Sequence, residues 1–503
     1  MGRRGRRNTS EDRTAPPVSA TNITGGSWSP VPTDQIEAIA NAALRILSEI
    51  GISEAPPIVC DAIIAAGGRV DGERLLFPID LLHATISDGP RSVLLAGQSP
   101  ERDLDVGGSR VFAGTGGAAP NLISEDSGDV RSSTLDDLHK AARLADALDH
   151  VSFFSRSLVA GDVEDPLDFD LATVAASLAG TSKHVMVQAT EPSHVASIAE
   201  LCYQIAGGEA AFRARPFVSL NINHAVPPLR FHAESASVMA EAVRHGFPVH
   251  CNVFGQLGAS SPVTMAGSVA QTLAETLAGL AFVHALDPTA PRIAGPRPMI
   301  TDLRTGGMAG GAGEQATTTA LAVQVLRHWD LPCSVIAGAT DSKSTDFQAG
   351  YEKALTINTA AQAGANLITQ AVGTQAGLMA ASFAAMVADN DMLGAILRAN
   401  TPPEITEEAL MLDAIAEVVS GEGHFLGRPE TYARMRSDFL YPEVADRSSL
   451  EQWQASDRAD MGQRAAKHAS EILARHWPSH LPAPIREKLS RQYGLEKNEG
   501  AHP

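Results

Sequence analysis

The feature that most constrains the fold is a regular alternation of short apolar runs and helix-like segments between Arg110 and Asn400. The apolar runs have strand length, and each precedes a segment whose apolar residues recur at helical spacing. Eight such pairs in even succession are typical of a closed (β/α)8 TIM-type barrel, and we expect that α/β fold. A doubly wound open sheet is the alternative. The expected strands cover residues 110–114, 151–157, 184–189, 217–223, 248–254, 291–295, 333–339 and 366–372.

The segments outside the alternation divide the rest of the chain. At 503 residues the chain is long for one barrel, and extensions would absorb the remainder. The patterns of charge, apolar spacing and Gly/Pro content predict five parts. These are a disordered basic tail (1–32), a mostly helical N-terminal cap (33–109), the barrel (110–400), a C-terminal helical extension packed outside the barrel (401–490) and a loose tail (491–503).

Composition limits the possible partners. The formal net charge is −19, so nucleic acid and anionic membrane surfaces would repel the chain. No uninterrupted apolar run of roughly 18 residues occurs, so we expect no membrane span. The four cysteines are scattered without C-x-x-C spacing, which predicts neither a disulfide framework nor a zinc site. A reducing, cytoplasmic location is the simplest interpretation.

Strand alternation predicts which side chains point into the barrel. The inward positions of the third, fourth, fifth, seventh and eighth strands would be Met186, Gln188, Ser219, Asn221, Asn223, His250, Asn252, Phe254, Ser334, Ile336, Gly338, Thr340, Asn366, Ile368 and Gln370. Six of these are amides, which are unfavourable when buried without hydrogen bonds. They indicate either a self-contained amide network that fixes the barrel register or a cavity for a small polar ligand. We favour the cavity, because the amides cluster towards strand ends, where barrel enzymes have their sites.

Two loops add charge near the expected strand ends. Residues 295–314 are rich in glycine but lack the lysine of a phosphate-binding loop. Arg304 in this loop would either bind a carboxylate or pair with Asp302. The second loop follows the strand at 333–339 and holds seven consecutive polar residues, from Thr340 to Asp346. Some of these would cap the next helix or form a solvated ion pair.

The sequence contains no recognisable nucleophile motif or metal-ligand cluster. A polar barrel mouth without these features needs a reactive partner from outside. Several segments together resemble the trimethylamine methyltransferase family, in its branch without pyrrolysine. They are "TLDDLHKAARLADALDHVSFF", "LNINHAVPPLRFHAESASVMAEAVRHGFPV", "TDLRTGGMAGGAGE", "GATDSKSTDFQAGYEKAL" and "GEGHFLGRPET".

The resemblance implies a methyltransferase that moves a methyl group from a quaternary amine, such as glycine betaine, to the Co(I) of a corrinoid carried by a separate protein. It also implies that the enzyme acts mainly by positioning its substrate, because the nucleophile belongs to the partner. A trimethylammonium group prefers aromatic faces or a nearby carboxylate, and a betaine carboxylate prefers arginine or amide donors.

On this basis we expect Asp341, His250 and Asp346 to be catalytic and no metal to be bound by the chain itself. The expected substrate-binding residues are Gln188, Asn221, Asn223, Asn252, Phe254, Arg304, Thr340, Lys343, Tyr351 and Gln370. Two other functions remain open. One is a binding or sensing barrel that has lost catalysis, and the other is a cofactor-independent lyase using Lys183 or Lys343. A homodimer is also possible for an acidic barrel of this size.

Overall fold

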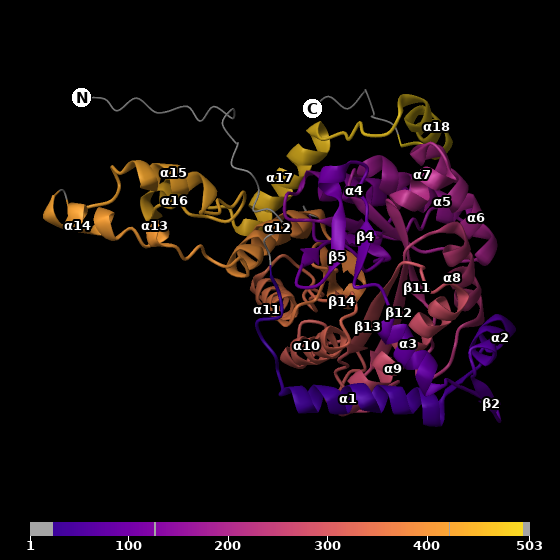
Figure 1. Cartoon of the computed structure of the whole chain (residues 1–503). Helices are drawn as coiled ribbons and strands as arrows, with labels where there is room; N and C mark the ends of the chain where they lie inside the picture. Colours follow the sequence, from indigo (N-terminus) through magenta and orange to yellow (C-terminus); the bar gives the residue numbers. More distant parts are fainter. Residues whose placement is uncertain (1–23, 125–126, 422, 496–503) are drawn as a thin grey trace.

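A computed structural model of the chain describes residues 24–124, 127–421 and 423–495. Within these residues, eight parallel strands form the centre of the molecule (Figure 1). Their bounds lie inside or overlap all eight expected runs. They are β6 (Phe112–Ala113), β9 (Phe153–Ser155), β10 (His184–Val187), β11 (Val218–Asn223), β12 (Val249–Gln256), β13 (Arg292–Met299), β14 (Ser334–Ile336) and β15 (Leu367–Thr369).

The strands close into a barrel. Strands β9 to β13 pair in sequence order as one parallel sheet, and β14, β15 and β6 pair as a second. Two parallel bridges join the sheets, between Gly114 and Phe153 on one side and between Ala294 and Cys333 on the other. The predicted (β/α)8 barrel is therefore confirmed, and the open-sheet alternative is wrong.

A helix follows each strand and covers the outside of the barrel. The eight helices are α4 (Leu135–Ala147), α5 (Pro166–Gly180), α6 (Pro192–Ala206), α8 (Ala233–His245), α9 (Met265–Leu286), α10 (Gly313–His328), α11 (Phe347–Ala363) and α12 (Phe383–Ala399), and the short α7 (Glu209–Ala214) lies after α6. In the described part of the chain, α9 alone is long and apolar enough to cross a membrane. However, 89% of its apolar window is buried, as expected for a core helix.

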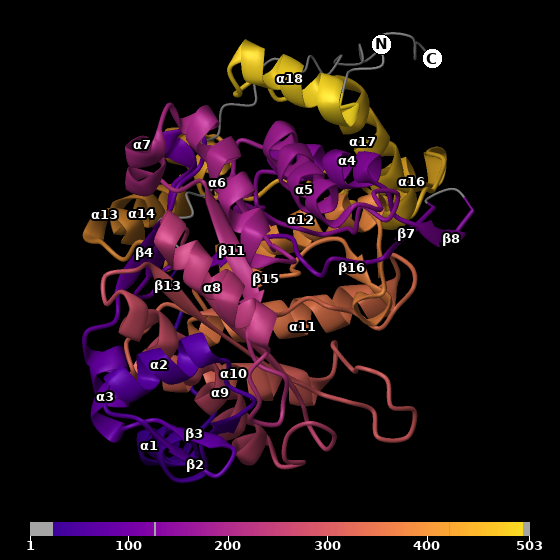
Figure 2. The same cartoon turned by 90° about the vertical axis from the view of Figure 1, so that its right-hand side faces the viewer.

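The N-terminal region packs beside the barrel, and its last hairpin covers the amino-terminal ends of the barrel strands. Helices α1 (Thr33–Arg45), α2 (Pro57–Ala65) and α3 (Ile79–Ser87) lie against α9, at the opposite end of the molecule from the last two helices (Figure 2). The π-helical turn η2 (Ile46–Ile50) and strands β1 (Ile52–Ser53), β2 (Arg69–Asp71) and β3 (Arg74–Leu76) complete this region. The hairpin of β4 (Ser92–Leu95) and β5 (Leu104–Gly107), with the 3-10 turn η3 (Pro100–Arg102) between its strands, packs its apolar side chains against the first inward residues of the barrel strands.

Part of the predicted disordered tail is ordered. The Gly25 N–H donates to Ser109 O at 2.8 Å, and the Gly26 and Trp28 N–H groups donate to Gln362 O at 2.8 and 3.2 Å. A Cβ on Gly25 would lie 2.5 Å from Ala361 O, so only glycine allows this close approach. The prediction of disorder is therefore wrong for residues 24–32, and residues 1–23 lie outside the described part of the chain.

A small sheet lies above the strand ends and links two βα loops. It contains β7 (Asn121–Ile123) and β8 (Val130–Ser132) from the loop after β6, and β16 (Thr374–Gln375) and β17 (Ala380–Ala381) from the loop after β15. The 3-10 turn η4 (Ala376–Leu378) lies between the last two strands. This sheet fixes the loops that form one side of the barrel mouth.

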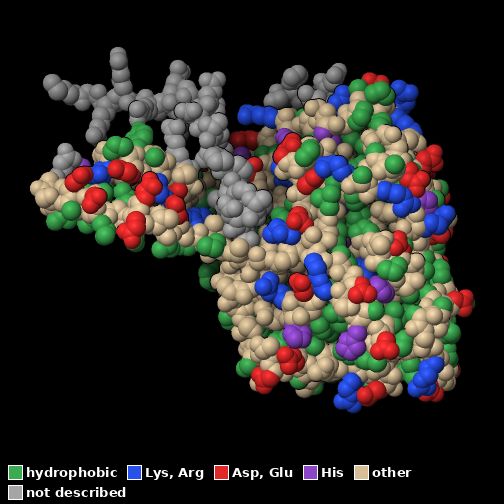
Figure 3. Space-filling model, viewed as in Figure 1, with side chains coloured by type: hydrophobic (Ala, Val, Ile, Leu, Met, Phe, Trp, Pro, Cys, Tyr) green, Lys and Arg blue, Asp and Glu red, His purple; other side chains and the backbone are tan. Residues whose placement is uncertain are grey.

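The C-terminal region has two parts. Helices α17 (Met461–Arg475) and α18 (Ala483–Tyr493) pack on the barrel helices α4, α5 and α12. The preceding helices project away from the barrel to one side (Figures 1 and 3). They are α13 (Glu407–Leu410), α14 (Leu412–Ser420), α15 (Pro429–Ser437) and α16 (Leu450–Ala455). The prediction that this segment packs on the barrel is wrong, because its apolar side chains are largely exposed.

Candidate active site

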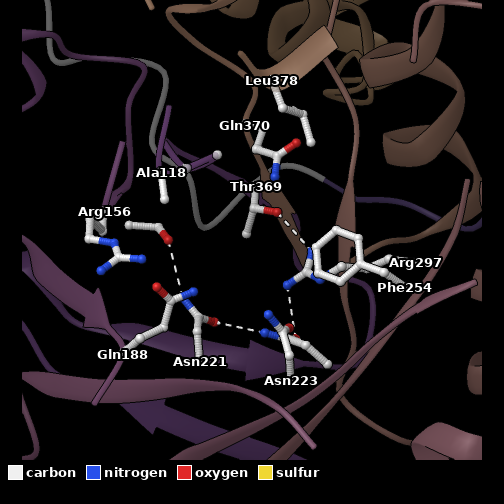
Figure 4. Close-up of a pocket in the computed structure, with 14 residues that line it drawn as sticks. Ala118, Arg156, Gln188, Asn221, Asn223, Phe254, Arg297, Thr369, Gln370 and Leu378 are labelled. Carbon is white, nitrogen blue, oxygen red and sulfur yellow. Dashed lines mark hydrogen bonds between the residues drawn. The ribbon is translucent and has the colours of Figure 1, made fainter. Parts of the chain in front are cut away.

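A cavity of about 280 Å³ opens at the carboxyl ends of the barrel strands, where barrel enzymes have their active sites (Figure 4). Its described lining comes from five of the eight strands, which are β9, β11, β12, β13 and β15, and from the loops that follow β6, β9, β10 and β15. The lining residues are Gly116, Gly117, Ala118, Ser155, Arg156, Gln188, Asn221, Asn223, Asn252, Phe254, Arg297, Thr369, Gln370 and Leu378.

The cavity gathers six of the residues expected from strand alternation: Gln188, Asn221, Asn223, Asn252, Phe254 and Gln370. Some of the amides bond one another. Asn252 Nδ2 donates to Asn221 Oδ1 at 3.3 Å, and Asn221 Nδ2 donates to Ser155 Oγ at 3.2 Å. The Oε1 atoms of Gln188 and Gln370 are buried without a partner. The amides therefore form a partial network that leaves acceptors facing the cavity.

Arg297 is a buried cation of the cavity that the sequence-based selection missed. Its guanidinium donates to Asn252 Oδ1 at 2.9 Å and to Thr369 Oγ1 at 3.1 Å, and its Nε has no hydrogen-bond partner in the described part of the chain. It also lies 5.4 Å from the centre of the Phe254 ring. Among the described residues it forms no ion pair. A buried charge without a counterion is unfavourable, so an anionic ligand would stabilise this site.

Arg156, which is partly buried, adds a second cation on another side of the cavity (Figure 4). Its guanidinium lies 5.7 Å from the Phe169 ring centre, and none of the described residues accepts a hydrogen bond from its Nε. Burial lowers the pKa of Arg297 to about 9 and that of Arg156 to about 10, so both remain charged at neutral pH. Because no carboxylate is among the described lining residues, the cavity is electropositive.

A longer strand than expected places Arg297 in the cavity. The sequence pattern ended the sixth strand at Gly295, but β13 continues to Met299 and pairs with β12 along its whole length. Ile293, Gly295 and Arg297 therefore alternate on the inner face. A Cβ on Gly295 would lie 2.0 Å from Asn252 Oδ1, so this glycine leaves the space that the Asn252 amide occupies beside Arg297.

The other seven predicted site residues are not among the described residues that line the cavity, and Arg304 and His250 are two of them. Arg304 is 88% exposed and pairs with Asp302 at 2.7 Å, which is the alternative that the sequence left open. His250 is fully buried and is not part of the cavity lining. Its Nε2 is 2.9 Å from Ser219 Oγ, which also contacts His184 Nε2 at 2.8 Å. Burial lowers the pKa of His250 to about 3, so its ring is neutral at ordinary pH.

The polar corner after β14 has mainly structural contacts. Thr340 Oγ1 donates to Glu352 Oε2 at 2.5 Å, and the Asp346 carboxylate caps α11 by accepting from Ala349 N at 2.9 Å. Lys343 is exposed and donates to Asp341 O at 2.6 Å. The half-exposed Tyr351 ring lies 5.7 Å from the Phe347 ring.

Asp341 is placed differently from the rest of that corner. Its carboxylate accepts from Gly310 N at 3.2 Å, and Oδ1 lies 3.7 Å from the position of a Cβ on Gly377. The next residue, Leu378, lines the cavity. Burial raises the pKa of Asp341 above its ordinary value. None of the three residues expected to be catalytic is among the described lining residues, and Asp341 approaches the lining through Gly377, the residue before Leu378.

The eighth strand has the opposite register from the one expected. Leu367 points into the barrel and packs against the β4–β5 hairpin, and Thr369 lines the cavity. Ile368 instead packs in the core between the strands and the outer helices. Asn366 bonds to backbone groups, including Cys333 N at 3.1 Å, and is not in the cavity. Gln370 still reaches the cavity because its φ of 65° departs from strand geometry. The prediction of Asn366 and Ile368 as inward residues is therefore wrong.

The two lysines considered for a lyase do not line the cavity. Lys183 is buried and donates to Ala145 O at 2.6 Å and Leu148 O at 2.7 Å, while Lys343 is exposed in the corner described above. A Schiff-base mechanism needs a lysine amine that can reach the substrate. The geometry gives the lyase alternative no support.

Comparisons with known proteins agree with the fold. A family model described as "Trimethylamine methyltransferase (MTTB)" matches residues 2–500. The trimethylamine methyltransferase MttB of Desulfitobacterium hafniense (strain DSM 10664 / DCB-2) is 29% identical and is matched over 92% of this chain and 95% of its own length. The glycine betaine methyltransferase of D. hafniense (strain Y51) is 27% identical, over 93% of this chain and 97% of its own.

Solved structures support the architecture. The monomethylamine methyltransferase MtmB of Methanosarcina barkeri matches with a TM-score of 0.54 over 90% of both chains, at 13% identity. A hydroxylamine complex of MtmB matches with a TM-score of 0.53 over 88% of both chains. These likenesses show a shared fold, and the family match spans nearly the whole chain. The chain therefore belongs to the trimethylamine methyltransferase family of enzymes.

Proposed function

We propose that this protein transfers a methyl group from a quaternary amine that carries a carboxylate, such as glycine betaine or a related betaine, to the Co(I) of a corrinoid on a partner protein. The observation that carries the substrate assignment is the buried Arg297, which has amide and hydroxyl acceptors but no counterion among the described residues. A substrate carboxylate would supply that counterion and accept charge-assisted hydrogen bonds. The family supplies the reaction type.

The charge pattern also orients the substrate. The carboxylate would lie beside Arg297 and Arg156, and the trimethylammonium group would point away from these cations, towards the mouth. Phe254 offers an aromatic face, and the unpartnered Oε1 atoms of Gln188 and Gln370 offer partial negative charge. A quaternary nitrogen already carries a positive charge, so a neutral tertiary amine leaves without a general acid. The residues need only to hold the methyl group in line and exclude water.

The mouth fits a large methyl acceptor that stays outside the cavity. A cavity of about 280 Å³ suits a small amine but cannot hold a corrin macrocycle. Beyond the carboxyl ends of the strands, large apolar side chains are exposed in the loops after β12, β13 and β15 and at the start of α11, namely Val263, Leu303, Met379 and Phe347. Such a rim suits contact with a large ring or the protein that carries it. When bound, the corrinoid supplies the Co(I) nucleophile.

The experiment is methylation of chemically reduced cob(I)alamin by the purified protein, followed through the absorbance of methylcobalamin. The panel contains glycine betaine, longer betaines, trimethylamine and tetramethylammonium. We expect methylation with a betaine and little with amines that lack a carboxylate. Methylation by tetramethylammonium alone would overturn the carboxylate assignment. Calorimetric binding of a betaine without methylation, even with an added corrinoid protein, would instead favour the sensing barrel.

A further inference from the structure

The projecting C-terminal segment has too few buried residues to stabilise its own fold. We call residues 402–441 the arm; it contains α13, α14 and α15, which have four, nine and nine residues. Helices this short are not stable alone in water. Among the arm's described side chains, only those of Ala414 and Val418 are buried. The arm therefore needs a further surface to cover it.

Two apolar stripes on the arm are exposed. Leu412, Ile415 and Val419 recur at i, i+3 and i+7 along α14, with exposures of 64%, 43% and 78%. Tyr432, Met435 and Phe439 repeat the same spacing along α15 and just past its end, with exposures of 67%, 39% and 65%. This spacing places each set on one side of its helix. Such stripes normally face a core or another helix, whereas here they face solvent.

The exposed apolar area is too large for an isolated monomer. Five further large apolar side chains of the arm are exposed, namely Ile405, Leu410, Phe425, Leu426 and Tyr441. From typical side-chain areas, the eleven together expose on the order of 1,000 Å² per copy. The largest apolar patch on a monomer is usually about 300–600 Å². Two such arms in contact would bury about 2,000 Å², the range of obligate homodimers.

We propose that the arm packs against the arm of a second copy of this chain and that the protein is a two-fold dimer built on this contact. The occupant must be present permanently, because the arm's short helices need cover in order to fold. A partner that binds only transiently does not meet that need, whereas a second copy does. Pairs of apolar helical stripes are self-complementary across a two-fold axis and form a four-helix contact. This proposal does not depend on the proposed function.

Electrostatics gives the contact a characteristic salt dependence. Each chain has a net charge of −19, so two copies repel one another and the apolar contact must outweigh that repulsion. Added salt screens the repulsion and also strengthens apolar association. The dimer is therefore expected to become tighter, not weaker, as the salt concentration rises.

The first test is the mass of the full-length protein by size-exclusion chromatography with light scattering, over a dilution series at low and high salt. We expect twice the 52.7-kDa chain mass, or an even multiple of it if dimers assemble further. A monomer at micromolar concentration, or an assembly with an odd number of copies, would overturn the proposal whatever the variants show.

The second test places a charge in each stripe. Val419→Asp on α14 and Tyr432→Arg on α15 should each raise the dimer dissociation constant by roughly 100-fold or more, because an unpaired charge would be buried twice across the two-fold axis. The matched control is Val70→Asp, at a 53%-exposed valine far from the arm, which should remain dimeric. Thermal melts separate dissociation from unfolding, because the barrel transition should persist in all three variants. Unchanged dimers in both arm variants would contradict the proposal.

Discussion

The most informative single substitution in the cavity is Arg297→Met. Methionine has a similar length and no charge, so it fills most of the space of the arginine side chain without a new polar group. It removes the hydrogen bonds to Asn252 Oδ1 and Thr369 Oγ1, and it removes the buried positive charge. The variant therefore tests whether this charge binds the substrate or only stabilises the barrel.

The expected magnitude comes from two competing effects. A guanidinium that binds a carboxylate through two charge-assisted hydrogen bonds contributes about 1.5–3 kcal/mol per bond. Their loss should lower kcat/KM for a betaine by roughly 100- to 1,000-fold or more. The effect on stability should be small. Leaving two acceptors without a donor costs about 1–3 kcal/mol, but removal of a buried cation without a counterion offsets that loss.

The assay compares wild type and Arg297→Met in the cob(I)alamin methylation reaction, with glycine betaine and with tetramethylammonium. The loss should be large for the betaine, and the residual rate with tetramethylammonium should change by less than about threefold. Arg69→Met is the control, because Arg69 is exposed and pairs with Asp71 far from the cavity. An equal loss with both substrates would refute the reasoning, since it would show that Arg297 acts on the fold of the cavity and not on a carboxylate.

Three further predictions concern single residues of the barrel. Gly295→Ala should lower kcat/KM at least tenfold at unchanged circular dichroism, because its Cβ would lie 2.0 Å from Asn252 Oδ1. Lys353→Met should lower the free energy of unfolding in urea by about 3–5 kcal/mol, because it leaves the buried Asp389 carboxylate without its ion-pair partner at 2.6 Å. The double variant Lys353→Met, Asp389→Leu should recover more than half of that loss. Asp146→Asn should lower the free energy of unfolding by about 2–4 kcal/mol at pH 7. Burial alone would raise the pKa of Asp146, but hydrogen bonds hold that pKa below its ordinary value. The stabilisation is therefore present above a pH of about 4 and is lost as the pH falls. The difference in the free energy of unfolding between wild type and variant should narrow in acid.

Strand alternation was enough to predict most of the amide lining. Asn221, Asn223 and Asn252 lie on strands that continue without interruption to the mouth, so a period of two places them correctly. The eighth strand is only three residues long, and Gln370 leaves it with a positive φ. A one-residue shift then exchanges the two faces, which explains the wrong register there.

Arg297 was missed for a related reason. A Gly-Pro pair normally marks the end of a strand, and the pattern was therefore cut at Gly295. The structure continues the strand through Pro296 and Pro298 because their neighbours in β12 supply a parallel partner along its whole length. Sequence periodicity cannot show such a tertiary effect. The arm illustrates the same limit, because an i, i+3, i+7 stripe predicts burial without saying which molecule provides the covering surface.

The proposed function leaves one charge to account for, which is the ammonium group of a betaine substrate. No acidic side chain is among the described residues that line the cavity, so any carboxylate that stabilises the ammonium must act from behind its wall. Asp341 is the candidate, because its carboxylate lies beside Gly377, the residue before the lining residue Leu378. A partly buried carboxylate that does not touch the ammonium group should still contribute on the order of tenfold in kcat/KM through its charge. Asp341→Asn should therefore lower methylation by every quaternary amine by a similar factor, whereas Arg297→Met should distinguish amines with a carboxylate from those without. If Asp341→Asn instead impaired only betaines, the carboxylate and the ammonium would have to exchange places in the cavity, and the corner after β14 would belong to the acid end of the substrate.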